Sequence, residues 1–221
     1  MFAVIFEVQP RPGQWDAYLA HGRLLRPELE RIDGFVENVR YRSLRREGVI
    51  LSLSSWRDEK AVVRWRTQAR HHQAQEGGRA AILADYHLRV GEITHDTQLA
   101  PGHTLAQQRL DETEVGGGTA VSLTTATIAP DAAASPDDVA ADLGLAPQAG
   151  GLVDLDLFDA VLTPGDLILL RTWRDAASAD AGTQGTAEVA RTRRVRVVRD
   201  YGMADRREAP QFYPEVPQSP K

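Results

Sequence analysis

Two adjacent histidines, His71 and His72, are the side chains of this sequence best suited to proton transfer, because imidazole titrates near neutral pH. They follow Trp65 in a proline-free stretch, residues 59–83, whose many alanine, arginine, glutamate and glutamine residues predict a helix. At about 100° per residue, His72 shares one stripe of that helix with Trp65, and His71 shares the next stripe with Gln75. We therefore expect only one of the two histidines to line an interior space.

Three interpretations of this cluster are open on the residues alone. In the first, Trp65 is a core residue and both histidines lie at the boundary, because histidine is commonly of intermediate burial. In the second, an imidazole lines a cavity between the helix and a sheet. The third is a metal site, but the sequence has no His-x-x-x-His pair and no cysteine, so we predict that no metal is bound.

Composition argues against several classes of function. The chain has 221 residues, a formal net charge of −5 and 42% hydrophobic residues, which is typical of a soluble protein and not of a nucleic-acid-binding one. No apolar run approaches the roughly 20 residues of a membrane span. Residues 1–8 are apolar but lack a basic flank and a cleavage site, so they predict a strand and not a signal peptide. The absence of cysteine excludes disulfides and thiol catalysis, and a cytoplasmic location is expected.

The predicted helix 59–83 belongs to a longer alternation of strands and helices. Alternating apolar residues predict a strand at each end of it, Asp58 is placed to cap its first turn, and Gly77-Gly78 is expected to bend it. Before it, the sequence predicts a strand, a helix kinked near Pro27 and two more strands, over residues 2–8, 14–32, 35–44 and 49–56. The resulting order, β-α-β-β-α-β, is the ferredoxin-like plan.

An acidic residue, Glu37, stands on the predicted strand 35–44, on the face that also carries Phe35, Val39 and Tyr41. A carboxylate among apolar neighbours is either a buried acid with a raised pKa or a side chain that reaches water or a partner. Glu37 is therefore a candidate for contact with a bound molecule.

The same plan recurs in weaker form in the second half of the chain. Strands are predicted at residues 119–128, 151–162, 167–173 and 192–201, and helices at 135–145 and 176–190. The predicted organisation is a first repeat, a glycine-rich linker, a divergent second repeat and an extended proline-rich tail, at residues 1–97, 98–118, 119–203 and 204–221.

Two short matches support a duplication. Trp173-Arg174-Asp175 matches Trp56-Arg57-Asp58, each after an apolar strand, and Arg194-Val195 matches Arg89-Val90 on the closing strands. The second helix of the second repeat has no tryptophan, histidine or tyrosine, so only the first repeat is predicted to hold a working pocket.

Six segments carry a family resemblance: AVIFEV, LLRPELERIDGF, LSLSSWRDEKAV, HHQAQEGGR and DYHLRV in the first repeat, and more weakly RVRVVRDYGM in the second. They resemble the antibiotic biosynthesis monooxygenase domain of the dimeric α+β barrel superfamily. The resemblance implies two ferredoxin-like units whose four-stranded sheets pair into a barrel with the helices outside. In this sequence two tandem ferredoxin-like repeats would form this α+β barrel within one chain.

The resemblance also implies roles for individual residues. Trp65 matches a pocket-lining tryptophan, and His71 matches the histidine of a His-x-x-Ala-Gln-x-x-Gly-Arg pattern that includes Gln75. Phe6 stands where haem-degrading and several quinone-forming members have a polar group, which argues against haem degradation. The predicted catalytic residues are His71 and His72, and the predicted substrate-binding residues are Trp65, Phe6, Gln75 and Glu37.

The function that the resemblance implies is a cofactor-independent monooxygenase acting on an aromatic or polyketide-like small molecule. A phenolate can pass an electron to oxygen, so the protein need supply only a dry pocket and a base for the phenolic proton, with no cofactor. The rival hypothesis is a non-catalytic module of the same fold that binds a small aromatic molecule or a partner protein. A pocket filled by Phe6 and Trp65 would favour the rival.

The expected assembly follows from the duplication. A single repeat would leave on the order of several hundred Å² of apolar sheet surface bare, which soluble monomers avoid, whereas two repeats cover it internally. The tail carries Phe212 and Tyr213 and is suited to clasp a second subunit. Both a monomer and a homodimer are therefore compatible with the sequence.

Overall fold

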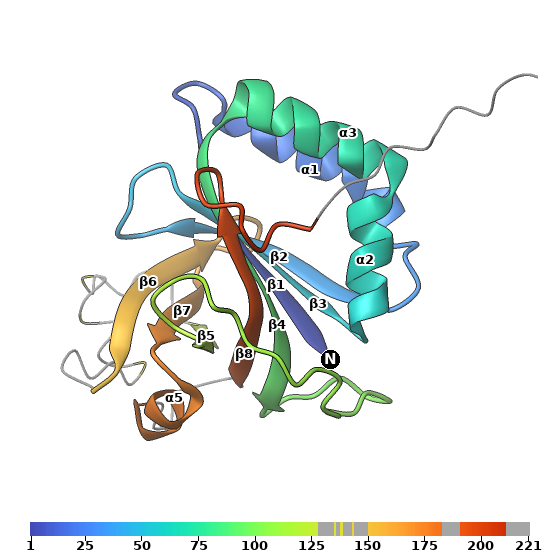
Figure 1. Cartoon of the computed structure of the whole chain (residues 1–221). Coiled ribbons are helices and arrows are strands. Elements are labelled where there is room, and N and C mark those ends of the chain that lie inside the picture. The colour runs from blue at the N-terminus through green and yellow to red at the C-terminus, as the bar shows by residue number, and fades with distance from the viewer. Residues whose placement is uncertain (128–134, 136–137, 139–142, 144–149, 183–190, 211–221) are drawn as a thin grey trace, which may run out of the picture.

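The chain forms one barrel of strands with helices on its outside (Figure 1). The computed structural model describes residues 1–127, 135, 138, 143, 150–182 and 191–210. The first half contains β1 (Phe2–Pro10), α1 (Trp15–Leu29), β2 (Phe35–Ser43), β3 (Ile50–Trp56), α2 (Glu59–Thr67), α3 (Ala69–Gly77), η1 (Gly78–Ile82) and β4 (Leu83–Asp96). The second half contains β5 (Ala120–Thr127), β6 (Leu152–Ala160), β7 (Asp166–Trp173), α5 (Ala176–Gly182) and β8 (Arg191–Gly202). Among the described helices, none is long and apolar enough to cross a membrane.

The eight strands close in the order β1-β3-β2-β6-β7-β5-β8-β4. Each half contributes four neighbouring strands in the ferredoxin-like order, and antiparallel pairing of β2 with β6 and of β4 with β8 joins the halves. The predicted fold class is thereby confirmed: two tandem ferredoxin-like repeats build the α+β barrel within one chain.

The interior of the barrel is an apolar core to which both halves contribute. Ala3 and Ile5 of β1 face inward and pack with Leu123 and Phe158 of the second half. Successive strand residues point to opposite faces, so Phe2 faces outward and packs under α2 against Trp56. The middle of the barrel is therefore filled with side chains.

A pair of buried arginines inside the barrel shows how closely the repeats correspond. Arg89 of β4 donates to the Thr172 hydroxyl at 2.6 Å, and Arg193 of β8 donates to the Ser55 hydroxyl at 3.1 Å. Each acceptor is the residue just before the tryptophan that ends a strand in the opposite half. These two contacts are equivalent under the exchange of the repeats.

This correspondence corrects one sequence match. Arg194 does not occupy the position of Arg89, because its guanidinium lies outside the barrel beside Asp180. Arg193 is the buried counterpart, at 3% exposure against 2% for Arg89. The predicted match was one residue out of register, which in a strand moves a side chain to the opposite face.

The two Trp-Arg-Asp turns have the same local structure. Asp58 accepts a hydrogen bond from the Ala61 amide at 2.8 Å, and Asp175 accepts one from the Ser178 amide at 2.7 Å. Each carboxylate thus caps a helix three residues before the amide that it binds. The tryptophans before them, Trp56 and Trp173, are fully buried.

The prediction of one helix over residues 59–83 is wrong. The backbone of Gln68 is extended, with φ −61° and ψ 127°, so α2 ends there and α3 begins after it. The Gln68 side chain holds the break, because its carbonyl oxygen accepts from the His71 amide at 2.7 Å while its amide group donates to Glu28 on α1. The expected irregularity at Gly77-Gly78 is present, since a π-helical turn starts at Gly78.

Some predicted elements lie outside the described residues. These are most of the helix 135–145, residues 183–190 of the helix 176–190, and the tail beyond residue 210 with Phe212 and Tyr213. The predicted linker is described throughout and packs on the barrel, where the Thr113 amide donates to the Val197 carbonyl at 3.0 Å.

Candidate functional site

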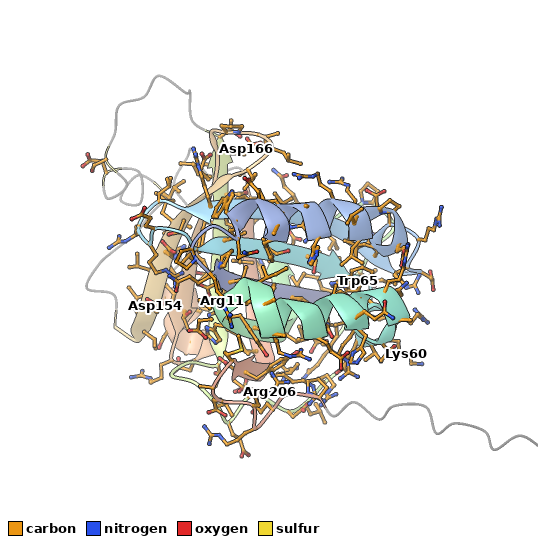
Figure 2. The ribbon with its side chains drawn as sticks, turned by 90° about the horizontal axis from the view of Figure 1, so that it is seen from above. Arg11, Lys60, Trp65, Asp154, Asp166 and Arg206 are labelled. Atoms are coloured by element: carbon orange, nitrogen blue, oxygen red, sulfur yellow. The ribbon has the colours of Figure 1, made fainter. Side chains whose placement is uncertain are left out.

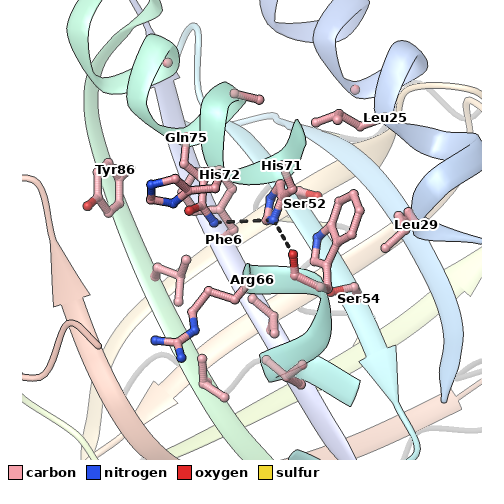
Figure 3. Close-up of a pocket in the computed structure, with 18 of the residues that line it drawn as sticks. Phe6, Leu25, Leu29, Ser52, Ser54, Arg66, His71, His72, Gln75 and Tyr86 are labelled. Atoms are coloured by element: carbon pink, nitrogen blue, oxygen red, sulfur yellow. Dashed lines mark hydrogen bonds between the residues drawn. The ribbon is translucent and has the colours of Figure 1, made fainter. Parts of the chain in front are cut away.

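A cavity of about 350 Å³ lies between the helices of the first half and the outer face of their sheet. In Figure 2, α1 runs beside α2 and α3, and together these helices cover the strands of the first half. The walls are mainly apolar, and Figure 3 shows side chains from α1, α3, β1, β3 and β4 around the space. The lining includes Val4, Phe6, Leu25, Leu29, Val62, Trp65, His71, His72, Gln75, Tyr86 and Leu88.

His71 is the best-positioned polar group of this cavity. Its ring stacks on Trp65, with ring centroids 4.0 Å apart and an angle of 15° between the planes. Its Nδ1 lies 2.9 Å from the carbonyl oxygen of Trp65. A carbonyl can only accept, so this hydrogen bond assigns the proton to Nδ1 and leaves Nε2 as the nitrogen able to take a proton. Gln75 approaches the same Nδ1 at 3.4 Å, a weaker contact that Figure 3 also marks.

The cavity keeps His71 neutral. The pKa of the imidazole is lowered from 6.5 to about 4, chiefly by burial and to a smaller extent by His72, and the hydrogen bond to the Trp65 carbonyl only partly offsets these effects. At neutral pH the side chain is therefore an uncharged hydrogen-bonding group and a proton acceptor.

Both histidines line the cavity, which contradicts the expectation that only one would do so. Figure 3 shows His72 on the side of Tyr86, and His71 on the side of Leu25 and Leu29. Both histidines belong to the first turn of α3, directly after the break at Gln68. The cavity contacts two neighbouring stripes of this helix, so both side chains line it. His72 Nε2 lies 3.4 Å from Glu76, whose side chain is largely exposed.

Phe6, Gln75 and Trp65 all line the cavity, as their assignment to substrate binding requires. The Phe6 ring sits 5.6 Å from that of Tyr86 and forms part of the sheet wall. One face of Trp65 is taken by His71, so this tryptophan positions the imidazole as well as bordering the space. Phe6 and Trp65 leave the cavity open, which is the arrangement a ligand site needs.

Glu37 is not part of this cavity. Its carboxylate accepts hydrogen bonds from Arg193 at 2.9 Å, from Arg191 at 3.1 Å and from the Ser55 hydroxyl at 3.1 Å. The sequence alternatives are thus decided in favour of a partnered carboxylate, on the opposite side of the sheet from His71.

A bulge separates Phe35 from the face that carries Glu37, Val39 and Tyr41. The pairing of β2 with β3 shifts between Phe35 and Glu37, so these residues no longer share a face. Phe35 packs outward on Trp56, whereas Val39 and Tyr41 join the barrel interior. The prediction that Phe35 lies on their face is therefore wrong.

Sequence reasoning missed several polar lining residues, among them Tyr18 on α1 and Asn38 and Arg40 on β2. Tyr18 follows the apolar period of its helix, a pattern that normally marks a core residue. Arg40 alternates with Val39 and Tyr41, and a charge at such a strand position normally marks a solvated face. The predicted helices of the first repeat must cover the outer face of its sheet. An arginine on that face therefore needs a partner, and this requirement could have identified Arg40.

No group of three or more potential metal ligands occurs within the described part of the chain.

The lowered pKa of His71 makes a prediction about stability. Between pH 6.5 and about 4 the unfolded chain binds a proton at this residue that the folded chain does not, so stability is lost as the pH falls through that window. The change in pKa from 6.5 to about 4 corresponds to roughly 3 kcal/mol. Urea unfolding at pH 7.5 and pH 4.5 should show this loss of stability in the wild type. His71→Gln should lose only the stability that other titrating groups contribute, which the wild type loses as well. Equal losses in both proteins would contradict it.

Comparison with known proteins finds similarity to proteins described as monooxygenases. Residues 1–77 match the family model described as antibiotic biosynthesis monooxygenase. A protein of Pyricularia oryzae named jasmonate monooxygenase ABM is 50% identical over 219 residues, covering 97% of this chain and 99% of its own length.

Several solved structures are similar to this chain. An aldoxime dehydratase, OxdRE, aligns with a TM-score of 0.55 at 11% identity, over 92% of this chain and 80% of its own, and this likeness concerns the fold alone. A solved antibiotic biosynthesis monooxygenase covers 41% of this chain and 95% of its own, at 16% identity and a TM-score of 0.37.

Proposed function

The chain belongs to the antibiotic biosynthesis monooxygenase family, and we propose that it oxidises a small, mainly apolar molecule in the cavity beneath α1, α2 and α3, with His71 as its base. The observation that carries this proposal is the state of His71. Its Nδ1 proton is committed to the Trp65 carbonyl, its ring is held by stacking, and its neutral Nε2 remains for a substrate proton.

For an aromatic, phenol-like substrate this arrangement supports a reaction without a cofactor. His71 takes the phenolic proton, and the phenolate passes one electron to O2. The resulting substrate radical and superoxide combine into a carbon–oxygen bond, and loss of water from the peroxide leaves a quinone carbonyl. The net change is CH2 + O2 → C=O + H2O, in which the substrate supplies all four electrons. An apolar, enclosed site suits these steps because it keeps water from the reactive intermediate.

A second substrate class is favoured by the relative's name. Jasmonate is a small carboxylate with an apolar body and no phenol, and its monooxygenase is 50% identical to this chain. Hydroxylation of such a carbon follows S–H + O2 + 2e⁻ + 2H⁺ → S–OH + H2O. This reaction needs a two-electron donor such as reduced flavin or nicotinamide, so the two classes differ in their demand for a reductant.

Oxygen consumption and product mass separate the two classes. The wild-type protein should be incubated under ¹⁸O2 with a chelator present, first with dihydroxynaphthalenes and anthrone, then with jasmonic acid with and without NADPH and flavin. Incorporation of one ¹⁸O atom without reductant supports the phenol-like class, and incorporation only with reductant supports the jasmonate class. Absence of incorporation with every substrate would overturn the proposal.

The rival function is a non-catalytic binding module. It predicts tight binding of a panel molecule, measured by quenching of tryptophan fluorescence, without any oxygen incorporation. The open cavity beside a positioned neutral histidine supports the enzyme over this rival.

A further inference from the structure

An arginine without a carboxylate partner lies in the wall of the cavity. Arg40 of β2 reaches up to α1, where its guanidinium lies so close to Gly22 that a Cβ added there would be 2.6 Å from Arg40 Cζ. A glycine at this position of α1 therefore leaves the room that the guanidinium occupies. No described aspartate or glutamate forms an ion pair with Arg40, and its buried Nε has no hydrogen-bond acceptor in the described part of the chain.

The groups around Arg40 add donors. The hydroxyl of Tyr18 lies beside the Arg40 guanidinium and the Ser52 hydroxyl, and burial raises the pKa of Tyr18, so this hydroxyl keeps its proton. The Asn38 amide donates to the Ser52 oxygen at 3.1 Å, and the Ser52 hydroxyl in turn hydrogen-bonds the Tyr18 oxygen, so the Tyr18 proton is left for a ligand. Arginine, tyrosine and serine thus converge with more donors than acceptors.

The charges of the cavity lining also favour an anionic ligand. The cationic lining residues are Arg40, Arg66, Arg79 and Arg199. The acidic lining residue is Glu59, which is already paired with Arg109 at 3.0 Å. The chain as a whole carries a net charge of −5, so the excess of arginine at this cavity runs against the composition of the protein. Arg40 is half-buried and its Nε lacks an acceptor, so a ligand that supplies the opposite charge would stabilise it.

We propose that the substrate of this cavity is a small carboxylate, whose carboxylate group binds Arg40 and the Tyr18 hydroxyl while its apolar body rests on Phe6 and Trp65. A carboxylate fits better than a compact anion because the planar guanidinium offers parallel N–H donors that match two carboxylate oxygens. The mainly apolar wall away from Arg40 fits a hydrocarbon body. The inference deepens the proposed function, since it assigns a substrate class to the same cavity.

The decisive measurement is the preference for an acid over its own methyl ester. Two pairs are used as probes, jasmonic acid with methyl jasmonate and 1-naphthoic acid with methyl 1-naphthoate, so that the charge changes while the apolar body stays the same. Binding is measured on the full chain by isothermal titration calorimetry under nitrogen at pH 7.5. For at least one pair the wild type should bind the acid about 10–100-fold more tightly, as charge-assisted hydrogen bonds require.

Substitutions locate the group that reads the charge. Arg40→Gln should abolish the preference for the acid and leave the affinity for the ester nearly unchanged. Arg23→Gln is the matched control, because Arg23 is an exposed arginine on the same helix as Gly22, outside the cavity, and it should retain the preference. Gly22→Ala keeps every charge but displaces the guanidinium, so it should weaken acid binding and serves if Arg40→Gln does not fold.

The outcomes separate this inference from the proposed function. Equal binding of acid and ester by the wild type, no binding of either acid, or an unchanged preference in both Arg40→Gln and Gly22→Ala would each overturn the carboxylate assignment. Incorporation of ¹⁸O by the same wild-type preparation would then show that the monooxygenase proposal survives. Loss of acid preference in Arg40→Gln together with its retention in Arg23→Gln supports the assignment.

Discussion

The variant His71→Gln is expected to lose about 10²–10⁴-fold in kcat, the range that removal of a general base usually costs. Glutamine preserves a hydrogen-bonding side chain of similar reach, but it cannot accept a proton. The Trp65 carbonyl, 2.9 Å from Nδ1, fixes the tautomer that makes Nε2 basic, and no neutral amide reproduces that function. The measurement is the initial rate of oxygen consumption with the substrate identified in the ¹⁸O2 experiment.

The matched control for this variant is His72→Gln. Both histidines line the cavity, but the stacked ring and the fixed tautomer belong to His71. We therefore expect His72→Gln to change kcat far less than His71→Gln. A large loss in His72→Gln with little loss in His71→Gln would assign the base to His72 and refute the proposal that His71 takes the substrate proton.

The pH profile gives an independent check. Because the pKa of His71 is lowered to about 4, the free enzyme should show kcat/KM that is level from neutral pH down to about pH 5 and falls only near pH 4. This acid limb should be absent from the residual activity of His71→Gln. An acid limb with an unperturbed histidine pKa near 6.5 would instead indicate that a solvated imidazole limits the reaction.

The strands and the duplication were predictable because they depend on local patterns. Strand residues alternate with period two, and the Trp-Arg-Asp turns carry a cap that works within three residues, as Asp58 and Asp175 both show. Pairing of the two halves then followed from the apolar faces they had to cover. These features depend on residues that are close in the sequence, so they could be predicted from a single sequence.

The break in the long helix was not predictable in the same way. Glutamine has a high intrinsic helix propensity, so Gln68 gives no sign of a helix end. Its extended backbone is held in part by a hydrogen bond from its side chain to Glu28, forty residues earlier on α1. The bulge that moves Phe35 off the face of Glu37, Val39 and Tyr41 likewise arises from pairing with β3. Both irregularities changed the predicted faces, because a helix break or a bulge alters the face to which the side chains beyond it point.

Arg40 shows a further limit of sequence reasoning. A charged residue on an alternating strand indicates water on that face, yet in this fold α1 covers the face and Gly22 makes space for the guanidinium. Only the three-dimensional arrangement reveals that the arginine is enclosed without a carboxylate. The chemistry of the candidate site is thus divided: His71, Trp65 and Gln75 are recognisable as a motif, whereas Tyr18 and Arg40 are brought to it by packing.

A second large effect is expected for Arg89→Met, which should lower the free energy of unfolding by about 3–5 kcal/mol, the cost of breaking a buried ion pair by removing one partner. Arg89 is 2% exposed, pairs with Glu7 and donates to Thr172 at 2.6 Å, so it links β1 and β4 of the first repeat to β7 of the second. Burial alone would raise the pKa of Glu7, but Arg89 and Arg46 outweigh that effect and keep the pKa lowered.

In Arg89→Met, the contact of Arg46 with Glu7 limits the loss of unfolding free energy but does not fully compensate for the missing arginine. Arg46 contacts Glu7 and Asp156 from the end of the barrel, and its side chain is 44% exposed, so water weakens its attraction for the buried carboxylate. In Arg89→Met the buried Glu7 carboxylate therefore keeps Arg46 and, at 4.0 Å, His87, and both of these partners are partly exposed to water. We expect the penalty to lie toward the lower end of the range.

A double variant and a surface control separate the ion pair from simple packing. Glu7→Leu combined with Arg89→Met removes both charges, and it should recover most of the stability, because apolar replacement of a buried pair is often neutral. Arg174→Met removes an arginine from an exposed pair with Asp175 and should leave the urea midpoint near that of the wild type. The midpoints and slopes of urea unfolding at pH 7.5 measure all four proteins. If Arg89→Met and the double variant are equally destabilised, the loss comes from packing of the arginine stem, and the ion pair does not stabilise the barrel.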